Sequence, residues 1–195
     1  MAKDWRVAKS LEMLRAQANQ VAPRRGKASD GTIGDAAHRA TKSEHNPDKD
    51  GVVRALDLTH DPVGGLDCQK LFDSLLASRD PRIQYVIWDR KIFNREVQPW
   101  VVRPYSGDNP HTKHLHVSVD EDPKLYDDQG LWTVPGYVGT TPPVLPRTAP
   151  TKPEAPSPAP APPVDEHERH DHLVEKKGFF ASLLDLILSL FGKGK

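Results

Sequence analysis

The chain has 195 residues, of which 36% are hydrophobic, and this supports one folded domain but little of a second. Its 27 Lys and Arg balance its 27 Asp and Glu, so we expect no nucleic-acid partner, because phosphate binding needs a surplus of basic residues on one face. The single cysteine, Cys68, excludes an intrachain disulfide and does not indicate an oxidising compartment.

Two helices are predicted from apolar residues that recur at intervals of three and four. The first pattern runs from Trp5 to Val21 and ends before Pro23, because proline cannot continue a helix. The second runs from Leu66 to Leu76, with Asp67 placed where a negative charge favours the first turn.

Short runs of β-branched and aromatic residues predict five strands, at 52–59, 85–88, 91–93, 101–105 and 115–119. Helices and strands are interspersed along the chain, and the short connections between strands suit antiparallel pairing. The predicted fold class is therefore α+β, with a small antiparallel sheet flanked by helices.

The composition changes sharply near residue 140. From residue 141 to 164, ten of the 24 residues are proline, so this stretch lacks the side chains and backbone donors to build a core. We expect a domain at 1–140, a Pro-rich and polar linker at 141–172, and a separate C-terminal helix at 173–195.

The predicted C-terminal helix is apolar around most of its circumference, with a narrow polar stripe and lysines at both ends. It is shorter than the ~20 apolar residues that a membrane-spanning helix needs. The flanking lysines favour an anionic membrane surface as its partner. Self-association and docking on its own domain are the alternatives.

Three of the nine histidines, His111, His114 and His116, fall close together. In a strand, successive side chains point to opposite faces, so His114 and His116 share one face with Ser118, while apolar residues take the other. Two imidazoles at this spacing reach one point above the sheet. One can bind a metal while its neighbour moves a proton.

A second run offers further ligands, because Ser43 and His45 form a Ser-x-His motif and Asp57 lies in the middle of a predicted strand. A carboxylate among apolar neighbours is costly to bury unless it is paired or bound to a cation. His45, Asp57 and His116 together supply two imidazole nitrogens and one carboxylate oxygen. That set leaves the fourth position of Zn2+ open for water, as is typical of catalytic zinc.

These motifs resemble the metallopeptidase superfamily that unites lysostaphin, the D-alanyl-D-alanine carboxypeptidases and the hedgehog domain. The runs SDGTIGDAAH at 29–38, YVIW at 85–88 and NPHTKHLHV at 109–117 resemble phage endolysins of actinobacterial hosts that carry a D-alanyl-D-alanine carboxypeptidase-like domain. The resemblance covers roughly residues 4–120. The pattern His-x-x-His-x-His is also similar to the penicillin-insensitive murein endopeptidases.

The resemblance implies roles for five residues. His45, Asp57 and His116 would be the zinc ligands, His114 the catalytic acid and base, and His111 an auxiliary catalytic group.

Eleven residues separate His45 from Asp57, more than in many carboxypeptidases of the superfamily, so residues 48–51 are expected to bulge outward. Lys113 occupies the position where the carboxypeptidase branch often has an acidic base, which favours His114 in that role.

The superfamily commonly holds a substrate carboxylate with a basic residue, and Arg39 and Arg103 are the candidates here, with ordinary surface arginines as the alternative.

The predicted function is that of a phage endolysin, a zinc peptidase that hydrolyses peptide bonds in the stem peptides of bacterial peptidoglycan. The first residues alternate in charge, unlike a secretory signal, so we expect synthesis in the host cytoplasm and action at the wall after membrane permeabilisation. Two alternatives are a non-catalytic zinc-containing module that binds the cell wall, and a chiefly membrane-active protein acting through the C-terminal helix. D-Ala-linked and L-alanyl-D-glutamate bonds are both candidate substrates.

Overall fold

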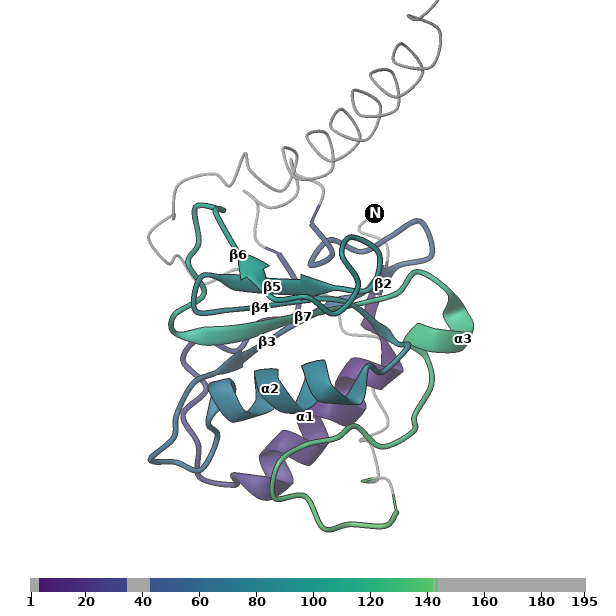
Figure 1. The fold of residues 1–195 in the computed structure, drawn as a ribbon. Helices are drawn as coiled ribbons and strands as arrows, with labels where there is room; N and C mark the ends of the chain where they lie inside the picture. Colours follow the sequence, from purple (N-terminus) through teal and green to yellow (C-terminus); the bar gives the residue numbers. More distant parts are fainter. Residues whose placement is uncertain (1–3, 35–42, 142, 144–195) are drawn as a thin grey trace, which may run out of the picture.

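A computed structural model of the chain describes residues 4–34, 43–141 and 143. The described residues have an α+β fold, in which an antiparallel sheet carries helices α1 and α2 on one face (Figure 1). The predicted fold class is thus confirmed for this part of the chain. The elements, in chain order, are β1 (Arg6–Val7), α1 (Lys9–Val21), β2 (Val52–Val53), β3 (Ala55–Thr59), α2 (Cys68–Ser78), β4 (Ile83–Trp88), β5 (Lys91–Asn94), β6 (Arg103–Pro104), β7 (His114–Val119) and α3 (Pro123–Tyr126).

The main sheet has five strands in the order β3-β7-β4-β5-β6, and every neighbouring pair is antiparallel. The last strand in the sequence, β7, is thereby placed between β3 and β4 and makes ladders with both. Because β7 carries the histidine motif, the chemistry predicted from the sequence lies in the interior of the sheet rather than at an edge.

Helix α1 begins later than the apolar periodicity predicts. Arg6 and Val7 form β1, which pairs in parallel with β2, and the helix starts only at Lys9. The amide N–H of Arg6 donates to the carbonyl of Gly51 as part of this pairing. The predicted end of the helix at Val21 is confirmed.

Helix α2 begins at Cys68, two residues after the start of the predicted apolar pattern. Asp67 is its N-cap, and its carboxylate accepts hydrogen bonds from the backbone N–H groups of Gln69 and Lys70. These bonds satisfy two of the amide donors that a helix leaves unpaired in its first turn. The favourable position predicted for Asp67 is therefore confirmed.

The predicted strand at 52–59 is divided at Arg54. Before this residue the chain pairs in parallel with β1, and after it β3 pairs with β7. The amide of Arg54 instead donates to the carbonyl of Glu44, at 3.0 Å. The predicted strand at 101–105 is also shorter, because only Arg103 and Pro104 pair with β5.

The two faces of β7 differ as its alternation predicts. Leu115, Val117 and Val119 are fully buried in the hydrophobic core. His116 and Ser118 point to the opposite face and are buried from that side. The core is continuous from α1 through α2 to this layer of the sheet, so the site face is backed by tightly packed apolar side chains.

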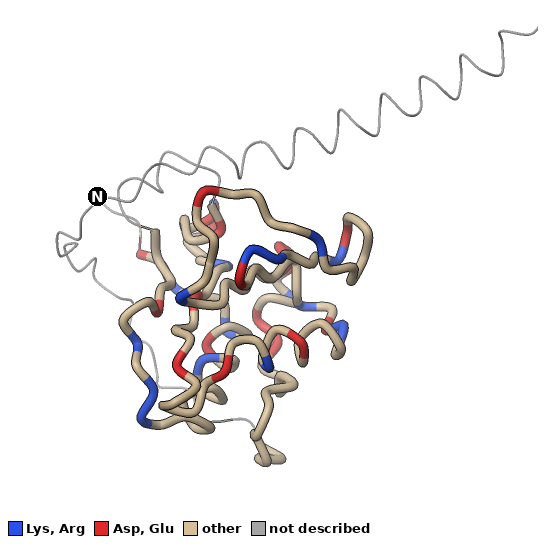
Figure 2. The backbone as a smooth tube through the Cα atoms, turned by 60° about the vertical axis from the view of Figure 1, so that its left-hand side comes forward, with Lys and Arg blue, Asp and Glu red and all other residues tan. Residues whose placement is uncertain are grey.

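Basic and acidic residues are interspersed along the described backbone in the view of Figure 2. Among the described residues, no helix is long and apolar enough to cross a membrane. The predicted helix at 173–195 and the predicted linker, apart from residues 141 and 143, lie outside the described residues.

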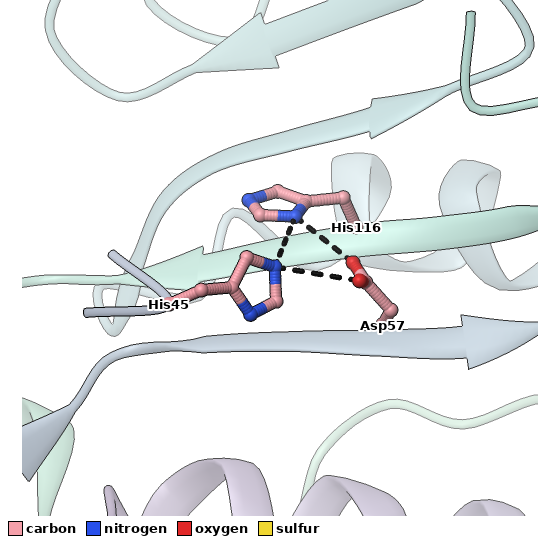
Figure 3. Close-up of side chains that lie close together, drawn as sticks. All are labelled: His45, Asp57 and His116. Carbon is pink, nitrogen blue, oxygen red and sulfur yellow. Dashed lines mark hydrogen bonds and ion pairs between the residues drawn. The ribbon is translucent and has the colours of Figure 1, made fainter. Parts of the chain in front are cut away.

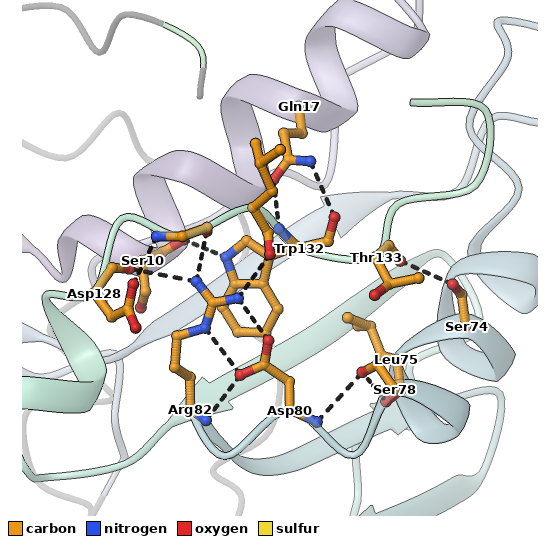
Figure 4. A network of polar contacts seen from close by, with 12 residues as sticks. Ser10, Gln17, Ser74, Leu75, Ser78, Asp80, Arg82, Asp128, Trp132 and Thr133 are labelled. Atoms are coloured by element: carbon orange, nitrogen blue, oxygen red, sulfur yellow. Dashed lines mark hydrogen bonds and ion pairs between the residues drawn. The ribbon is translucent and has the colours of Figure 1, made fainter. Parts of the chain in front are cut away.

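The segment after α3 is attached to the domain through Arg82 (Figure 4). The Arg82 guanidinium pairs with Asp80 at 2.5 Å and donates to the carbonyls of Gly130 and Leu131 at 2.7 and 3.1 Å. It also lies 4.0 Å above the ring of Trp132. One buried side chain therefore joins the start of β4 to the segment that crosses α1.

Trp132 completes this attachment from the other side. Its indole N–H donates to the carbonyl of Ser10 at 2.7 Å, and its backbone N–H and C=O both pair with the side-chain amide of Gln17. The apolar pattern that predicted α1 does not include Gln17. The structure instead buries it completely as a hydrogen-bonding partner for another backbone segment.

We predict that Arg82→Met lowers the free energy of unfolding by about 3 kcal/mol, because it removes the ion pair with Asp80 and the donors to the carbonyls of Gly130 and Leu131. Urea denaturation measures this loss. Arg24→Met, at an exposed arginine, is the control and should change stability by less than about 0.5 kcal/mol. Equal effects of the two substitutions would contradict the assigned role of Arg82.

Candidate metal centre

His45, Asp57 and His116 converge on one point above the sheet (Figure 3). His116 Nδ1 lies 3.0 Å from Asp57 Oδ1 and 3.2 Å from His45 Nε2, and His45 Nε2 lies 3.4 Å from Asp57 Oδ2. The three side chains are between 3% and 17% exposed. The structure thus brings together the three residues singled out from the sequence, and this group can hold a metal ion.

Strand pairing and one loop create this geometry. Asp57 on β3 is directly opposite His116 on β7, so both side chains lie on the same face of the sheet. His45 arrives from outside the sheet, in the segment that precedes β2. The backbone hydrogen bond from Arg54 to Glu44 ties that segment to the junction between β2 and β3.

Residues 48–51 form a tight turn between His45 and β2. The Asp48 carboxylate accepts hydrogen bonds from the amides of Asp50 and Val52 at 2.8 and 2.9 Å, and Gly51 has a positive φ of 78°. A positive φ strains most residues with a Cβ atom but not glycine. The turn absorbs the extra residues between His45 and Asp57 in the way that the sequence predicts.

Hydrogen bonds on the far side of each ring orient the two ligand histidines. His45 Nδ1 lies 2.9 Å from the carbonyl of Thr32, which can only accept, so Nδ1 carries the proton and Nε2 presents a lone pair to the site. His116 Nε2 lies 2.9 Å from the hydroxyl of Ser118. When Nε2 donates to that hydroxyl, Nδ1 of His116 likewise presents a lone pair.

The residues present fit a bound cation. Two imidazole lone pairs and a carboxylate that face each other at 3.0–3.4 Å repel unless a proton or a cation lies among them. Ligand histidines that donate their second N–H to a protein oxygen are usual at metal centres. The donor set of two nitrogens and one carboxylate oxygen suits zinc or another first-row divalent metal.

The pKa of Asp57 lies well below its usual range. Burial by itself raises the pKa of this carboxyl, but the positive charge of His45 when that ring is protonated, and the hydrogen bonds that His116 and His45 donate when protonated toward Asp57, outweigh the effect of burial. Asp57 is therefore ionised in the folded protein and supplies the negative charge that a cation site requires.

His114 and His111 lie beside the ligand group. His114 Nε2 is 3.9 Å from Asp57 Oδ1, and the rings of His111 and His114 are 5.1 Å apart in an edge-to-face arrangement. Burial, followed by the nearby histidines, lowers the pKa of His111 to about 3, and burial also lowers the pKa of His114. Both rings are therefore neutral near pH 7.

Nδ1 of His111 and Nδ1 of His114 are buried with no hydrogen-bond partner among the described residues. His111 is held with a positive φ of 50°, and its amide donates to the side chain of Asn109 at 3.0 Å. The ring of Tyr105 packs against His111 at 5.4 Å. These contacts direct two neutral imidazoles with spare hydrogen-bonding capacity toward the ligand group.

Arg103 lies on the site face but far from the ligand group. The strand registers place Asp57, His116, Ile87, Ile92 and Arg103 in one row across the five strands. At ~4.8 Å per strand, the backbone of Arg103 is about 14 Å from that of His116 along this row. Arg39, the other predicted substrate-binding residue, lies outside the described residues.

The sequence did not indicate the role of Gly31. This residue forms a β-bridge with Asp57 along the free edge of β3, and a Cβ atom at this position would lie 2.9 Å from Asp57 Oδ2. The glycine therefore leaves the space that the carboxylate occupies. No local pattern marks this requirement, because the contact joins segments 26 residues apart.

Asp30, next to Gly31, holds this loop on the sheet. Its carboxylate accepts hydrogen bonds from the amide and hydroxyl of Thr59 at 2.9 and 2.8 Å, and it pairs with the fully buried Arg25 guanidinium at 2.6 Å. Burial by itself raises the pKa of Asp30, but the hydrogen bonds from Arg25 and Thr59 outweigh burial and hold the pKa below its ordinary value.

Comparisons with protein-family models, with curated proteins and with solved structures found no match. The described residues define an α+β domain with two histidines and one aspartate gathered on the face of its sheet that lies opposite the helices. The family resemblance rests on the sequence motifs alone.

We predict that Asp30→Asn lowers the free energy of unfolding by about 2 kcal/mol at pH 7, through loss of the ion pair with Arg25 and of a charged acceptor for Thr59. The folded-state pKa of Asp30 is lowered, so its contribution is present above the ordinary value of 3.8 and disappears as the pH falls through the folded-state value. Urea denaturation at pH 7 and pH 3 should show that the free energies of unfolding of the variant and of wild type differ less at the lower pH. Asp108→Asn, at an exposed carboxylate, serves as control. A stability difference between Asp30→Asn and wild type that is larger at pH 3 than at pH 7 would contradict the prediction.

Proposed function

We propose that the chain is a zinc-dependent peptidase that hydrolyses peptide bonds of bacterial peptidoglycan, as a phage endolysin does. The observation that carries this proposal is the convergence of His45 Nε2, Asp57 and His116 Nδ1, with the neutral His114 beside them. Three protein ligands of this composition, with a further position left for water, characterise catalytic rather than structural zinc.

Zinc, when bound, lowers the pKa of a water ligand to about 7 and polarises a scissile carbonyl. The residues beside it supply the proton transfers. His114, kept neutral by burial, accepts a proton from the attacking water and returns it to the leaving amine. His111, also neutral, donates an N–H to the oxygen on which negative charge develops.

The choice of peptidoglycan as the substrate comes from the motif resemblance at 29–38, 85–88 and 109–117. Both D-Ala-linked and L-alanyl-D-glutamate bonds are candidates. Arg103 is one candidate for binding a substrate carboxylate, with its backbone three strand spacings from that of His116. Arg39 is the second candidate for binding a substrate carboxylate.

The proposal places the protein in the host cytoplasm on synthesis and at the cell wall after the membrane is permeabilised. The predicted helix at 173–195 would then bring the domain to an anionic membrane surface. A chiefly membrane-active protein remains an alternative that depends on this helix alone.

A non-catalytic zinc-containing wall-binding module is the second candidate function. Because Lys113 stands where the carboxypeptidase branch often has an acidic base, catalysis would depend on His114, and a domain in which His114 transfers no proton would only bind the wall. The two candidates share the metal site and differ in whether His114 transfers protons.

The metal site is tested by zinc stoichiometry. We predict one zinc per chain, and loss of that zinc in His45→Ala, Asp57→Ala and His116→Ala, because a site with three protein ligands rarely survives the loss of one. Elemental analysis of the purified proteins measures the content. His60→Ala removes an imidazole whose Nδ1 accepts from the amide of Cys68 and should leave the zinc in place. Full zinc content in all three ligand variants would rule out this site.

The catalytic role is tested at His114. We predict that His114→Ala keeps its zinc and loses wall-degrading activity by ~10²-fold or more, the scale expected for a general acid and base. Release of new amino groups from purified peptidoglycan measures the activity, and mass spectrometry of the products identifies the bond. Lys113→Ala, at the exposed neighbouring position, should keep its activity.

Near-normal turnover in His114→Ala would remove His114 from the mechanism. A wild-type protein that binds zinc and peptidoglycan but releases no amino groups would support the wall-binding module instead.

A further inference from the structure

We infer that Tyr85 is a positioning residue for the metal site proposed above. Its ring stacks on His116, and its hydroxyl donates a hydrogen bond to the segment that carries His45. The inference, which rests on that metal site, assigns a role to a tyrosine that is not itself a ligand. It connects two ligands that come from different parts of the fold.

The ring of Tyr85 restrains His116. Tyr85 on β4 is directly opposite Ser118 on β7, and the position of His116 is therefore diagonal to it. Aromatic side chains reach such diagonal neighbours. The two rings are stacked, with centroids 5.4 Å apart and an angle of 16° between their planes. The tyrosine ring thus limits rotation of the imidazole about its own axis, while Ser118 holds Nε2 at the far end.

The hydroxyl of Tyr85 reaches the segment that carries the first ligand. It donates a hydrogen bond to Glu44 Oε2 at 2.7 Å, and Glu44 immediately precedes His45. An O–H bond to an ionised carboxylate is stronger than one between neutral groups. Glu44 is also held through its backbone, because its carbonyl accepts from Arg54. Side chain and backbone together fix the residue next to His45.

His45 needs this restraint more than the other two ligands do. Strand pairing fixes Asp57 and His116 relative to each other, whereas His45 lies outside the sheet, and its Nδ1 is bonded to the carbonyl of Thr32. A ligand that samples several positions binds more weakly, because ordering it on metal binding costs conformational entropy. The contact between Tyr85 and Glu44 lowers that cost.

The test measures metal affinity and does not depend on turnover. In the full-length chain, Tyr85→Phe keeps the stacked ring and removes only the hydroxyl. We expect its affinity for Zn2+, measured by competition with a chromophoric chelator, to fall by about 10-fold or more. The visible absorption of the Co2+-loaded protein should change as well, because a less constrained His45 alters the ligand geometry. A residue that only supports the fold would leave that spectrum unchanged.

Variants of Glu44 separate the hydrogen bond from the negative charge. Glu44→Gln keeps an oxygen that can accept from the tyrosine hydroxyl and should bind Zn2+ within about 3-fold of wild type, whereas Glu44→Ala should match Tyr85→Phe. The double variant of Tyr85→Phe and Glu44→Ala should bind no more weakly than either single variant, since both remove the same contact. Equal weakening by Gln and Ala at position 44 would assign the effect to charge and overturn the inference.

Tyr137→Phe is the matched control. It also removes a tyrosine hydroxyl, one that donates to the carbonyl of Thr141 at 3.0 Å, on a ring that packs against the hydrophobic core. Its Zn2+ affinity and Co2+ spectrum should equal those of wild type. Wild-type affinity in Tyr85→Phe overturns this inference alone. A wild-type chain that binds neither metal overturns the metal site itself, and this inference with it.

Discussion

The antiparallel pairing of β3 with β7 is the constraint on which the candidate site depends. It places Asp57 directly opposite His116, and a shift of one residue would turn one of the two side chains to the other face of the sheet. The alternation along β7 prevents such a shift, because it would expose Leu115, Val117 and Val119 and bury polar groups in their place. The hydrophobic core thus fixes the register that brings the two ligands together.

The same pairing brings together polar and ionisable side chains whose burial side by side is unfavourable. An ionised carboxylate and four imidazoles share a largely buried space on the site face, and buried Nδ1 atoms of His111 and His114 make no hydrogen bond among the described residues. A fold selected only for stability would not gather them, since unpaired buried polar groups are destabilising. The surrounding sheet, with its closely packed core, tolerates this arrangement, and such local conflicts are typical of functional sites.

Attachments between distant segments hold the remaining parts in place. Arg82 and Trp132 join the segment after α3 to α1 and β4, Asp30 joins its loop to β3, and Tyr85 joins β4 to the residue before His45. Each attachment uses a side chain to satisfy backbone or charged groups that no regular secondary structure pairs. Two of them, those of Asp30 and Tyr85, hold segments that lie next to the ligand set.

The sequence by itself determined the features that depend on local spacing. Pro23 limited the end of α1, Asp67 marked the start of α2, and alternation assigned the two faces of β7, while the unusual position of Asp57 and the histidine spacing indicated the three residues that the fold brings together. Apart from the meeting of the three site residues, which are far apart in the chain, each of these signals lies within a few residues of its effect, so the sequence can display it.

Only the tertiary structure decided the contacts between segments far apart in the chain. The parallel pairing of β1 with β2, the space left by Gly31 for Asp57, and the hydrogen bond between Tyr85 and Glu44 each join residues that no periodicity relates. The residues at both ends of such a contact are individually ordinary. Their roles arise because packing of the whole core fixes which segments meet, and that outcome depends on all the elements at once.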